Sequence, residues 1–447
     1  MTEPVGEGSL LWTPSPAKVA AANLTDFLAW LGDRGQRFDG YDALWQWSVT
    51  DLDGFWQAIW DYCGIQCSAA PQAVLGRREM PGAQWFPGAL LNYAEHILRN
   101  EAPGQTALLA VSETASLTAM DWADLAGQVR ILATQLRVLG VGTGDRVVAY
   151  LPNIPQTVVA MLATTAIGAI WASCSPDFGW PGVLDRFRQL EPKVLICVDG
   201  YQYGGRRFDR TGELRQIVAG LESLQQVIFL PYLEAEATAP TGEALYWADV
   251  LDADPVPAAD FSFEQVPFSH PLWILFSSGT TGLPKPIVHS HGGIVLEHLK
   301  ALALHQDLTS RDSFFWYTTT GWMMWNYLVG GLLVGATIVL YDGSAVYPDT
   351  GALWRLVADA GVTYAGTGAP YLLACMKEGL RPAAENDLSA LRGVGSTGSP
   401  LPPEGFRWAY QELGTGSSEL ILGSLSGGTD LCTGFVGPSP LLPVRAG

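Results

Sequence analysis

From about Thr106 onward, the sequence alternates short β-type segments with longer segments of helical spacing, and no other feature constrains the fold as strongly. Segments in this order typically form a mostly parallel sheet whose faces are covered by helices. The sequence therefore predicts an α/β fold. The expected strands are residues 107–111, 146–151, 194–198, 313–317, 337–340 and 362–365, and the expected helices are 121–139, 157–167, 182–190, 293–304 and 351–359.

The regions outside this alternation differ in character. Residues 24–60 have helical spacing and carry six large aromatic residues as anchors, with Asp51 as the expected helix cap before Phe55. Residues 233–263 are rich in Ala, Pro, Asp and Glu, so we expect them to cross the surface. Because 447 residues exceed the size of one hydrophobic core, two or three packed subdomains are expected.

Composition and charge exclude several classes of partner. Apolar residues make up 48% of the chain and charged residues only 15%, so much of the sequence has to be interior. The formal net charge of −19 opposes binding to nucleic acid and to anionic lipid. The apolar runs at 158–172 and 327–341 are too short to span a membrane. An acidic N-terminus and scattered cysteines, expected to be buried and reduced, predict a cytoplasmic location.

Residues 274–285 form an apolar strand-like segment followed by a loop of hydroxyl-bearing residues and glycines that ends in a lysine. Gly279 and Gly282 supply unusual backbone angles that let N–H groups converge on an anion, and Lys285 adds a positive charge. The loop therefore predicts a phosphate site. Its candidate residues are Ser277, Ser278, Gly279, Thr280, Thr281, Gly282 and Lys285.

Other functions fit this sequence less well. Pro284 and Pro286 remove backbone donors from the helix that a Walker A loop requires, which disfavours a P-loop NTPase. A nicotinamide oxidoreductase would need a G-x-G-x-x-G fingerprint after an early strand, and a serine acyl transferase a G-x-S-x-G elbow; the sequence has neither. A flexible loop without a ligand is the remaining alternative, although such loops seldom combine a preceding strand with a terminal lysine.

Three further segments could line a pocket. Residues 317–325 follow an expected strand and place threonine hydroxyls beside Trp322 and Met323, with core packing as an equal alternative. Residues 395–400 are glycine-rich, so their backbone could approach a flat ring. Residues 426–430 end in Asp430, a candidate Mg²⁺ ligand, although an isolated Asp after glycines is more often a turn residue. His289 and His291 lack a third ligand nearby, so capping or substrate contact is favoured over metal binding.

These segments occur in the order and spacing of the adenylate-forming acyl-CoA synthetases, and the chain resembles that family over nearly its whole length. The resemblance is strongest to the members that activate acetoacetate. It lies in residues 44–49, 175–179, 289–291, 316–326 and 340–344. It implies the large N-terminal domain of these enzymes, with two helix-covered, mostly parallel sheets and a partial β-barrel-like subdomain. Residues 1–105 would be an aromatic-rich helical segment of acetyl-CoA synthetase type, and residues 106–447 the AMP-binding core.

The resemblance also implies a two-step ligase reaction that uses ATP, Mg²⁺ and coenzyme A. A carboxylate, expected to be that of acetoacetate, attacks the α-phosphorus of ATP to give an acyl-adenylate and diphosphate, and the thiol of coenzyme A then displaces AMP. Positioning and charge neutralisation dominate such chemistry, which suits a site built of donors.

Roles for individual residues follow from the same resemblance. The catalytic set would be Thr280, Lys285, Thr429 and Asp430, with Thr281 beside them on the outer phosphates, Thr429 on the α-phosphate and Asp430 on the metal. Further ATP contacts would come from Ser277, Ser278, Gly279, Gly282, Gly398, Ser399, Pro400 and Gly428. The acyl pocket would contain Thr320, Trp322, Met323 and Gly427, and Arg206 would contact coenzyme A.

Two departures from the family carry expectations of their own. Acetyl-CoA synthetases have a tryptophan at the position of Gly427, so we expect a deeper acyl pocket in which the hydroxyls of residues 318–320 meet the ketone of the acid. The resemblance ends near Arg445, before the family's small C-terminal domain, so we expect a chain that lacks this domain. A separate chain that supplies the domain, a fragment that binds ATP without turnover, and a ligase for another short acid remain alternatives.

Overall fold

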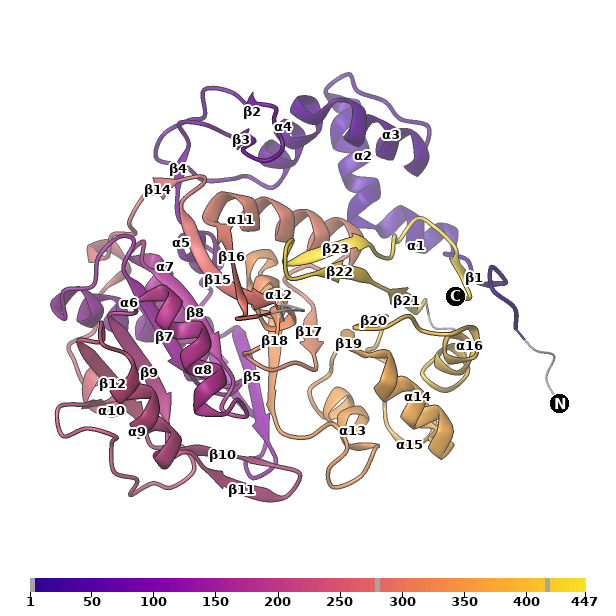
Figure 1. Ribbon diagram of the computed structural model, residues 1–447. Coiled ribbons are helices and arrows are strands. Elements are labelled where there is room, and N and C mark those ends of the chain that lie inside the picture. Colours follow the sequence, from indigo (N-terminus) through magenta and orange to yellow (C-terminus); the bar gives the residue numbers. More distant parts are fainter. Residues whose placement is uncertain (1–4, 278–281, 415–418) are drawn as a thin grey trace.

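The computed structural model describes residues 5–277, 282–414 and 419–447, and two seven-stranded sheets form its centre (Figure 1). In the first sheet all neighbouring strands are parallel except the last pair, which is an antiparallel hairpin at the sheet edge. Its strands are, from edge to edge, β13 (Leu245–Tyr246), β12 (Gln226–Leu230), β9 (Val194–Val198), β7 (Arg146–Tyr150), β8 (Ile170–Cys174), β15 (Pro271–Ser277) and β16 (Lys285–Ser290).

The second sheet has the same design, with one antiparallel pair at one edge. Its strands are β21 (Ile421–Ser424), β20 (Gly393–Thr397), β19 (Tyr364–Gly368), β17 (Ser313–Trp316), β18 (Thr337–Asp342), β5 (Thr106–Ser112) and β6 (Thr118–Asp121). The prediction of two mostly parallel sheets is confirmed. Since parallel strands are buried on both faces, they read as continuous apolar runs, as Val194–Val198 does.

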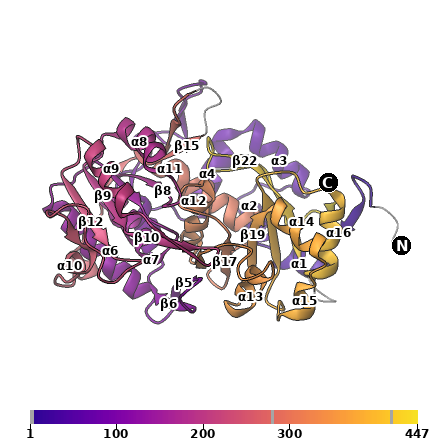
Figure 2. The same cartoon turned by 60° about the horizontal axis from the view of Figure 1, so that its bottom comes forward.

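Helices lie between the two sheets and on their outer faces (Figures 1 and 2). In β9, Val194, Ile196 and Val198 point into the core between the sheets, whereas Leu195 and Cys197 point to an outer core. The helices between the sheets include α5 (Tyr93–Leu98), α6 (Trp122–Val138), α7 (Pro155–Ala166), α11 (His291–Leu299) and α12 (Met323–Gly330). The outer helices are α8 (Trp180–Phe187) and α9 (Thr211–Gly220) on the first sheet, and α13 (Ala352–Asp359), α14 (Ala369–Glu378) and α16 (Pro403–Glu412) on the second.

Short elements complete the fold. A π-helical turn, η3 (Lys300–His305), extends α11, and a 3₁₀ turn, η4 (Gly331–Val334), extends α12. Two-stranded sheets are formed by β1 (Leu10–Trp12) with β24 (Val444–Arg445), β2 (Leu75–Arg77) with β3 (Gln84–Trp85), β4 (Leu90–Leu91) with β14 (Val266–Pro267), β10 (Gly200–Tyr203) with β11 (Arg206–Asp209), and β22 (Ser426–Gly428) with β23 (Thr433–Val436). The fold also contains the short helices η1 (Arg188–Leu190), α10 (Trp247–Leu251), η2 (Ala258–Asp260) and α15 (Pro382–Glu385). Among the described strands, these small pairs take the place of the expected partial barrel.

Some expectations from sequence need correction. The segment 233–263 is not only a surface crossing, because it contains α10 and the edge strand β13, and Trp247 and Val250 of α10 are buried. Packing of these two side chains overrides the polar composition around them. Strand β19 begins at Tyr364 and not at residue 362. Four of the six free cysteines are buried as expected, but Cys67 is exposed.

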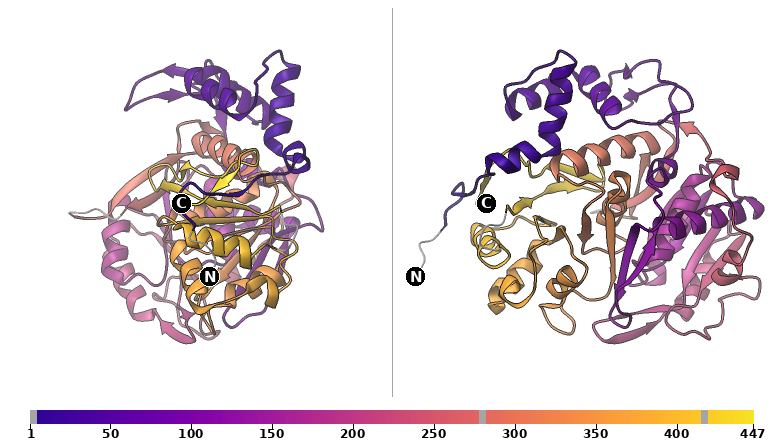
Figure 3. Two further views of the ribbon diagram at one scale, coloured as in Figure 1. Left: turned by 90° about the vertical axis from the view of Figure 1, so that its right-hand side faces the viewer. Right: turned by 180° about the vertical axis from the view of Figure 1, so that it is seen from behind.

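Helices α1 (Pro16–Ala21), α2 (Asn23–Asp33), α3 (Tyr41–Thr50) and α4 (Leu52–Tyr62) form an N-terminal segment that lies along the α11 side of the core (Figure 3). Asp51 caps α4 as predicted, because its Oδ1 accepts a hydrogen bond from the Gly54 backbone N–H at 3.0 Å. Among the aromatic residues expected as anchors, Trp60 is buried, but Trp45 is 53% exposed. None of the helices in the described residues has the length and apolar character needed to cross a bilayer.

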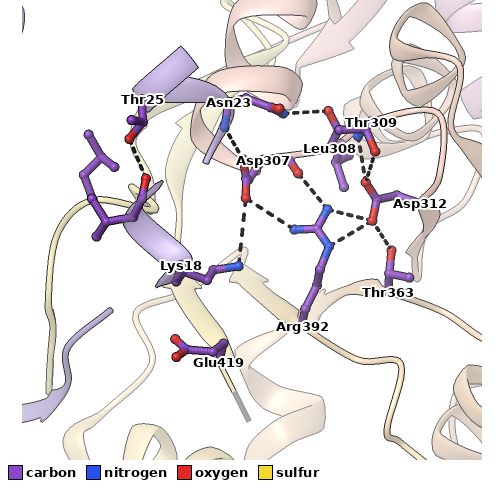
Figure 4. A network of polar contacts seen from close by, with 12 residues as sticks. Lys18, Asn23, Thr25, Asp307, Leu308, Thr309, Asp312, Thr363, Arg392 and Glu419 are labelled. Carbon is purple, nitrogen blue, oxygen red and sulfur yellow. Dashed lines mark hydrogen bonds and ion pairs between the residues drawn. The ribbon is translucent and has the colours of Figure 1, made fainter. Parts of the chain in front are cut away.

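A network of charged groups ties the N-terminal segment to the core (Figure 4). One carboxylate oxygen of Asp307 accepts a hydrogen bond from the Asn23 backbone N–H at 2.8 Å, and the other lies 3.9 Å from Lys18 Nζ. Arg392 lies between two acids, 3.8 Å from Asp307 Oδ2 and 2.7 Å from Asp312 Oδ1. Burial raises the pKa of Asp307 and lowers that of Lys18, so desolvation outweighs the attraction across their long contact.

Candidate active site

The predicted phosphate loop connects β15 to β16 at the edge of the first sheet. Ser277 and Lys285 are Cα partners in this hairpin, so the two ends of the loop lie side by side. Lys285 is exposed and begins a strand, which confirms that no helix follows the loop. The backbone angle expected at Gly282 stays a prediction, because its φ depends on residue 281, which lies outside the described part of the chain. The predicted residues Ser278, Gly279, Thr280 and Thr281 lie outside the described part of the chain.

A cavity of about 120 Å³ lies where several other predicted residues meet. Four stretches of chain form it: the end of β17, the end of β20, α12 with the residue before it, and the β22–β23 hairpin with the residue before it. The predicted residues that line it are Gly398, Gly428 and Thr429 from the nucleotide set and Trp322, Met323 and Gly427 from the acyl set. Met324 and Thr397 line it as well and lie in the segments 317–325 and 395–400 that were expected to form a pocket; the lining residues that sequence reasoning missed are Trp316, Tyr327, Leu425, Thr433 and Gly434. Tyr327 stands four residues after Met323 on α12, and this helical spacing could have identified it.

Gly427 has a backbone role that its position in the pocket does not explain. It lies opposite Gly434 in the antiparallel β22–β23 pair. A Cβ at Gly427 would lie 2.8 Å from the Cα of Gly434 and would also collide with the carbonyl oxygen of Thr433. The close approach of the two strands therefore requires glycine here, independently of pocket depth. A tryptophan at this position would disrupt the hairpin before it filled the pocket.

Two histidines fix the turn that carries Thr429 and Asp430. Nε2 of His289 donates to the Asp430 carbonyl oxygen at 3.2 Å, and Nε2 of His298 donates to the Cys432 carbonyl oxygen at 2.9 Å. Burial lowers the pKa of His289, and lowers that of His298 to about 4, so both rings stay neutral near pH 7. Hydrogen bonds from the two histidines thus hold the buried side of the turn, while Asp430 is exposed at the surface.

The threonines expected to meet a ketone face elsewhere. Oγ1 of Thr320 donates to the Leu151 carbonyl oxygen at 2.6 Å, and Oγ1 of Thr318 donates to the Thr319 carbonyl oxygen at 3.3 Å. None of residues 318–320 lines the 120 Å³ cavity, and their contact with a ketone stays a prediction. Thr320 instead lines a neighbouring cavity of about 40 Å³, and Thr429 lines both.

The segment predicted to contact adenine follows β20. Gly398 has a φ of +86°, a conformation that glycine adopts without strain. A Cβ there would meet no atom within 4 Å, so the approach to its backbone is open. Ser399 and Pro400 are exposed beside it but do not line the cavity. Only Gly398 of these three predicted residues therefore faces the central cavity.

Arg206 lies apart from the central cavity, at the start of β11 in the hairpin at the lower edge of Figure 1. The carboxylate of Glu113 holds this hairpin. It accepts hydrogen bonds from the backbone N–H groups of Gly204 at 2.7 Å and Gly205 at 2.8 Å, and from that of Ser344 at 2.8 Å. Arg206 is exposed next to this turn. The carboxylate of Glu113, which directly follows β5, thus sets the position of the hairpin that carries Arg206.

A larger cavity of about 610 Å³ lies behind the β22–β23 hairpin. Its other walls come from the N-terminal helices α2, α3 and α4 and from α11 with η3. Of the predicted site residues that the structure describes, none lines it. The two cavities share four lining residues, namely Tyr327, Leu425, Thr433 and Gly434.

Known proteins match this chain over most of its length. The family model of the AMP-binding enzymes matches residues 98–438, and that of the acetyl-coenzyme A synthetase N-terminus matches residues 41–97. The acetoacetyl-coenzyme A synthetase of Rhizobium meliloti (strain 1021) is 44% identical over 440 residues, which are 98% of this chain and 66% of that protein. The acetoacetyl-CoA synthetase of Danio rerio is 40% identical over 460 residues, covering 100% of this chain and 67% of that protein.

A solved structure agrees with these sequence matches. The acetoacetyl-CoA synthetase from Streptomyces lividans matches with a TM-score of 0.94 and 52% identity, over 98% of this chain and 68% of that chain. The chain thus spans about two thirds of the length of the relatives that it matches. By these matches, the chain belongs to the AMP-binding enzyme family and, within it, to the acetoacetyl-CoA synthetases.

Proposed function

We propose that this chain binds ATP and acetoacetate, joins them as an acyl-adenylate, and passes the acyl group to coenzyme A. The observation that carries the proposal is the meeting of predicted nucleotide residues, Gly398 and Thr429, with predicted acyl residues in one cavity. Relatives named acetoacetyl-CoA synthetases support the choice of acid. A volume of about 120 Å³ suits a short acid, since drug-sized ligands need about 300–1,000 Å³.

The nucleotide side of the site would bind and orient the reacting phosphate. In the first step a carboxylate oxygen of the acid bonds to the α-phosphorus, and the bond from that phosphorus to the diphosphate oxygen breaks. The hydroxyl of Thr429 would donate to an α-phosphate oxygen, while Thr280 and Thr281 would donate hydrogen bonds to the outer phosphates and Lys285 would neutralise their charge. The backbone at Gly398 would contact adenine, with Ser399 and Pro400 at the rim.

The donor set at the turn suits Mg²⁺. Asp430 is an exposed carboxylate directly after the Thr429 hydroxyl, and Mg²⁺ is usually held by one or two carboxylates together with substrate phosphates and water. Asp430 would therefore hold the ion against the triphosphate. When bound, Mg²⁺ supplies neutralisation of phosphate charge.

The acyl side of the cavity is largely apolar. Trp316, Tyr327 and Met323 would surround the carbon chain of the acid, and Gly427 would keep the hairpin wall flat. In the second step the sulfur of coenzyme A bonds to the acyl carbonyl carbon, the bond to AMP breaks, and the thiol proton passes to solvent. Arg206 would bind a phosphate of coenzyme A.

Pyrophosphate release by the purified chain tests the proposal. With Mg²⁺, ATP and acetoacetate we expect release that exceeds release with acetate, with butyrate or without acid. Asp430→Asn should abolish it, whereas Asp387→Asn, which removes an exposed carboxylate from a distant loop, should leave it unchanged. Release with equal rates for all acids would refute the assignment of acetoacetate, and absence of both release and ATP binding would refute the function.

A further inference from the structure

Arg186 is a positive charge without a carboxylate partner beside the candidate active site. It lies near the end of α8 and is half-buried. Among the described residues no acid lies within ion-pair distance of it. Although acids outnumber bases by 44 to 25 in this chain, none of the described acids neutralises this guanidinium group.

Aromatic contacts and one hydrogen bond hold the Arg186 side chain. Its guanidinium carbon lies 4.8 Å from the ring centre of Phe178 and 5.9 Å from that of Phe276. Nη1 donates to the Gly182 carbonyl oxygen at 2.6 Å. A guanidinium has five N–H donors in a fixed fork, and stacking on a ring leaves the donors at its edge available. The side chain is therefore fixed in place with most of its donors still unused.

The cavity that Arg186 lines connects it with the predicted reaction centre. This cavity of about 40 Å³ is also lined by Leu275 and Phe276, at the end of β15, and by Thr429. Phe276 is next to Ser277, where the predicted phosphate loop begins. Arg186 thus lies between the first residues of that loop and the hydroxyl proposed for the α-phosphate.

The far end of the phosphate loop touches the same helical face. Gln189, three residues after Arg186, donates from Nε2 to the Pro284 carbonyl oxygen at 2.9 Å. Pro284 immediately precedes Lys285. Side chains three residues apart lie on one side of a helical turn, so Arg186 and Gln189 both face the β15–β16 hairpin.

We propose that Arg186 binds the β- and γ-phosphates of ATP and the diphosphate that leaves. Planar guanidinium groups match phosphate oxygens with paired hydrogen bonds, and a half-buried charge gains more from such a partner than an exposed one. Arg186 would add a fixed charge to the mobile one of Lys285. Its contribution should therefore be confined to ligands that carry the outer phosphates. This inference rests on the proposed function, because it concerns the same nucleotide site.

Calorimetric titration of the chain with Mg²⁺ and ATP, with inorganic diphosphate, and with AMP tests the inference. Arg186→Gln should weaken binding of ATP and diphosphate by about 10- to 100-fold, the loss expected for a hydrogen bond to a charged group, and change AMP affinity by less than about twofold. Arg186→Lys, which keeps the charge but not the fork, should fall between the two. Arg188→Gln is the matched control, because it removes the same charge two residues away, where Nε donates to the Gly220 carbonyl oxygen.

The possible results distinguish the role of Arg186 from the proposed function. Diphosphate affinity that is unchanged in Arg186→Gln, or an equal loss for AMP, would overturn the role of Arg186 and leave the proposed function standing. A wild-type chain that binds none of the three ligands would overturn the proposed function and this inference with it. A loss of the same size in Arg188→Gln would show that any nearby positive charge, and not the position of Arg186, strengthens phosphate binding. That result would also overturn the inference.

Discussion

The substitution Glu113→Gln should loosen the β10–β11 hairpin without unfolding the chain. The carboxylate accepts three backbone hydrogen bonds at 2.7–2.8 Å, two of them from the hairpin residues Gly204 and Gly205. A glutamine keeps one acceptor oxygen and turns an N–H₂ group toward a backbone N–H, so at least one of these bonds is lost. A hydrogen bond to a charged group contributes about 1.5–3 kcal/mol, and each 1.36 kcal/mol is a factor of ten. Amide exchange at Gly204 and Gly205 should therefore accelerate by roughly 10- to 150-fold.

Hydrogen exchange measured by mass spectrometry on a peptide covering residues 200–209 is the assay. Glu234→Gln is the control, because Glu234 also contacts this hairpin, through an exposed ion pair with Arg207. Such a pair contributes only about 0–1 kcal/mol, so the control should accelerate exchange by less than about fivefold. Unchanged exchange in Glu113→Gln, or equal acceleration in both variants, would refute the reasoning that Glu113 anchors the hairpin.

Three further predictions concern stability. Gly427→Ala should destabilise the chain by about 1–3 kcal/mol, because the new Cβ would collide with the backbone of β23. Gly428→Ala is the control: its Cβ would meet no atom within 4 Å, so it should change stability by less than about 0.5 kcal/mol. Equal melting temperatures of the two variants would contradict this reasoning. Arg392→Met should destabilise by about 3–5 kcal/mol in urea unfolding, because the buried carboxylate of Asp312 loses its charged partner. A change below about 1 kcal/mol would show that the other contacts of Asp312 are sufficient to hold it. Lowering the pH from 7 to 5 should reduce the free energy of unfolding by a net of about 5 kcal/mol. Burial lowers the pKa of four histidines to about 3–4, below the unfolded value of about 6.5; they are His96, His291, His298 and His305. The unfolded state therefore binds more protons as the pH falls, and each histidine lowers the free energy of unfolding by about 2 kcal/mol. Asp342, whose pKa burial raises to about 7, opposes them by roughly 2–3 kcal/mol, and a urea midpoint that is independent of pH would refute this balance.

Much of the fold could be predicted because its causes are local. Strand β9 is five apolar residues buried on both faces, and it was found with its exact bounds from that run alone. The cap at Asp51 depends on a residue three positions away. The absence of a helix directly after Lys285 follows from the prolines beside it. In each case the deciding interaction lies within a few residues along the chain.

The rest could not be predicted because it depends on contacts between distant segments. Gly427 has to be glycine because it pairs closely with Gly434, seven residues later, in the β22–β23 hairpin. No periodicity in the sequence predicts this pairing. The hydroxyl of Thr320 is bonded to Leu151, 169 residues earlier, and so does not reach the cavity it was expected to line. Arg186 carries no motif, and only the packing of α8 against the β15–β16 hairpin reveals that it lies beside the site.

The β22–β23 hairpin, the wall shared by the 120 Å³ and 610 Å³ cavities, has a consequence for how this family can diversify. Because a single hairpin separates the two cavities, its position depends on the size of the side chains that pack on either side of it. If the 120 Å³ cavity holds the acid as proposed, substitutions in α3 and α4, on the far side of the hairpin, would alter the space available to it without contacting it. Selection for a different acid has two separate sets of positions on which to act, and one of them lies entirely in the N-terminal segment.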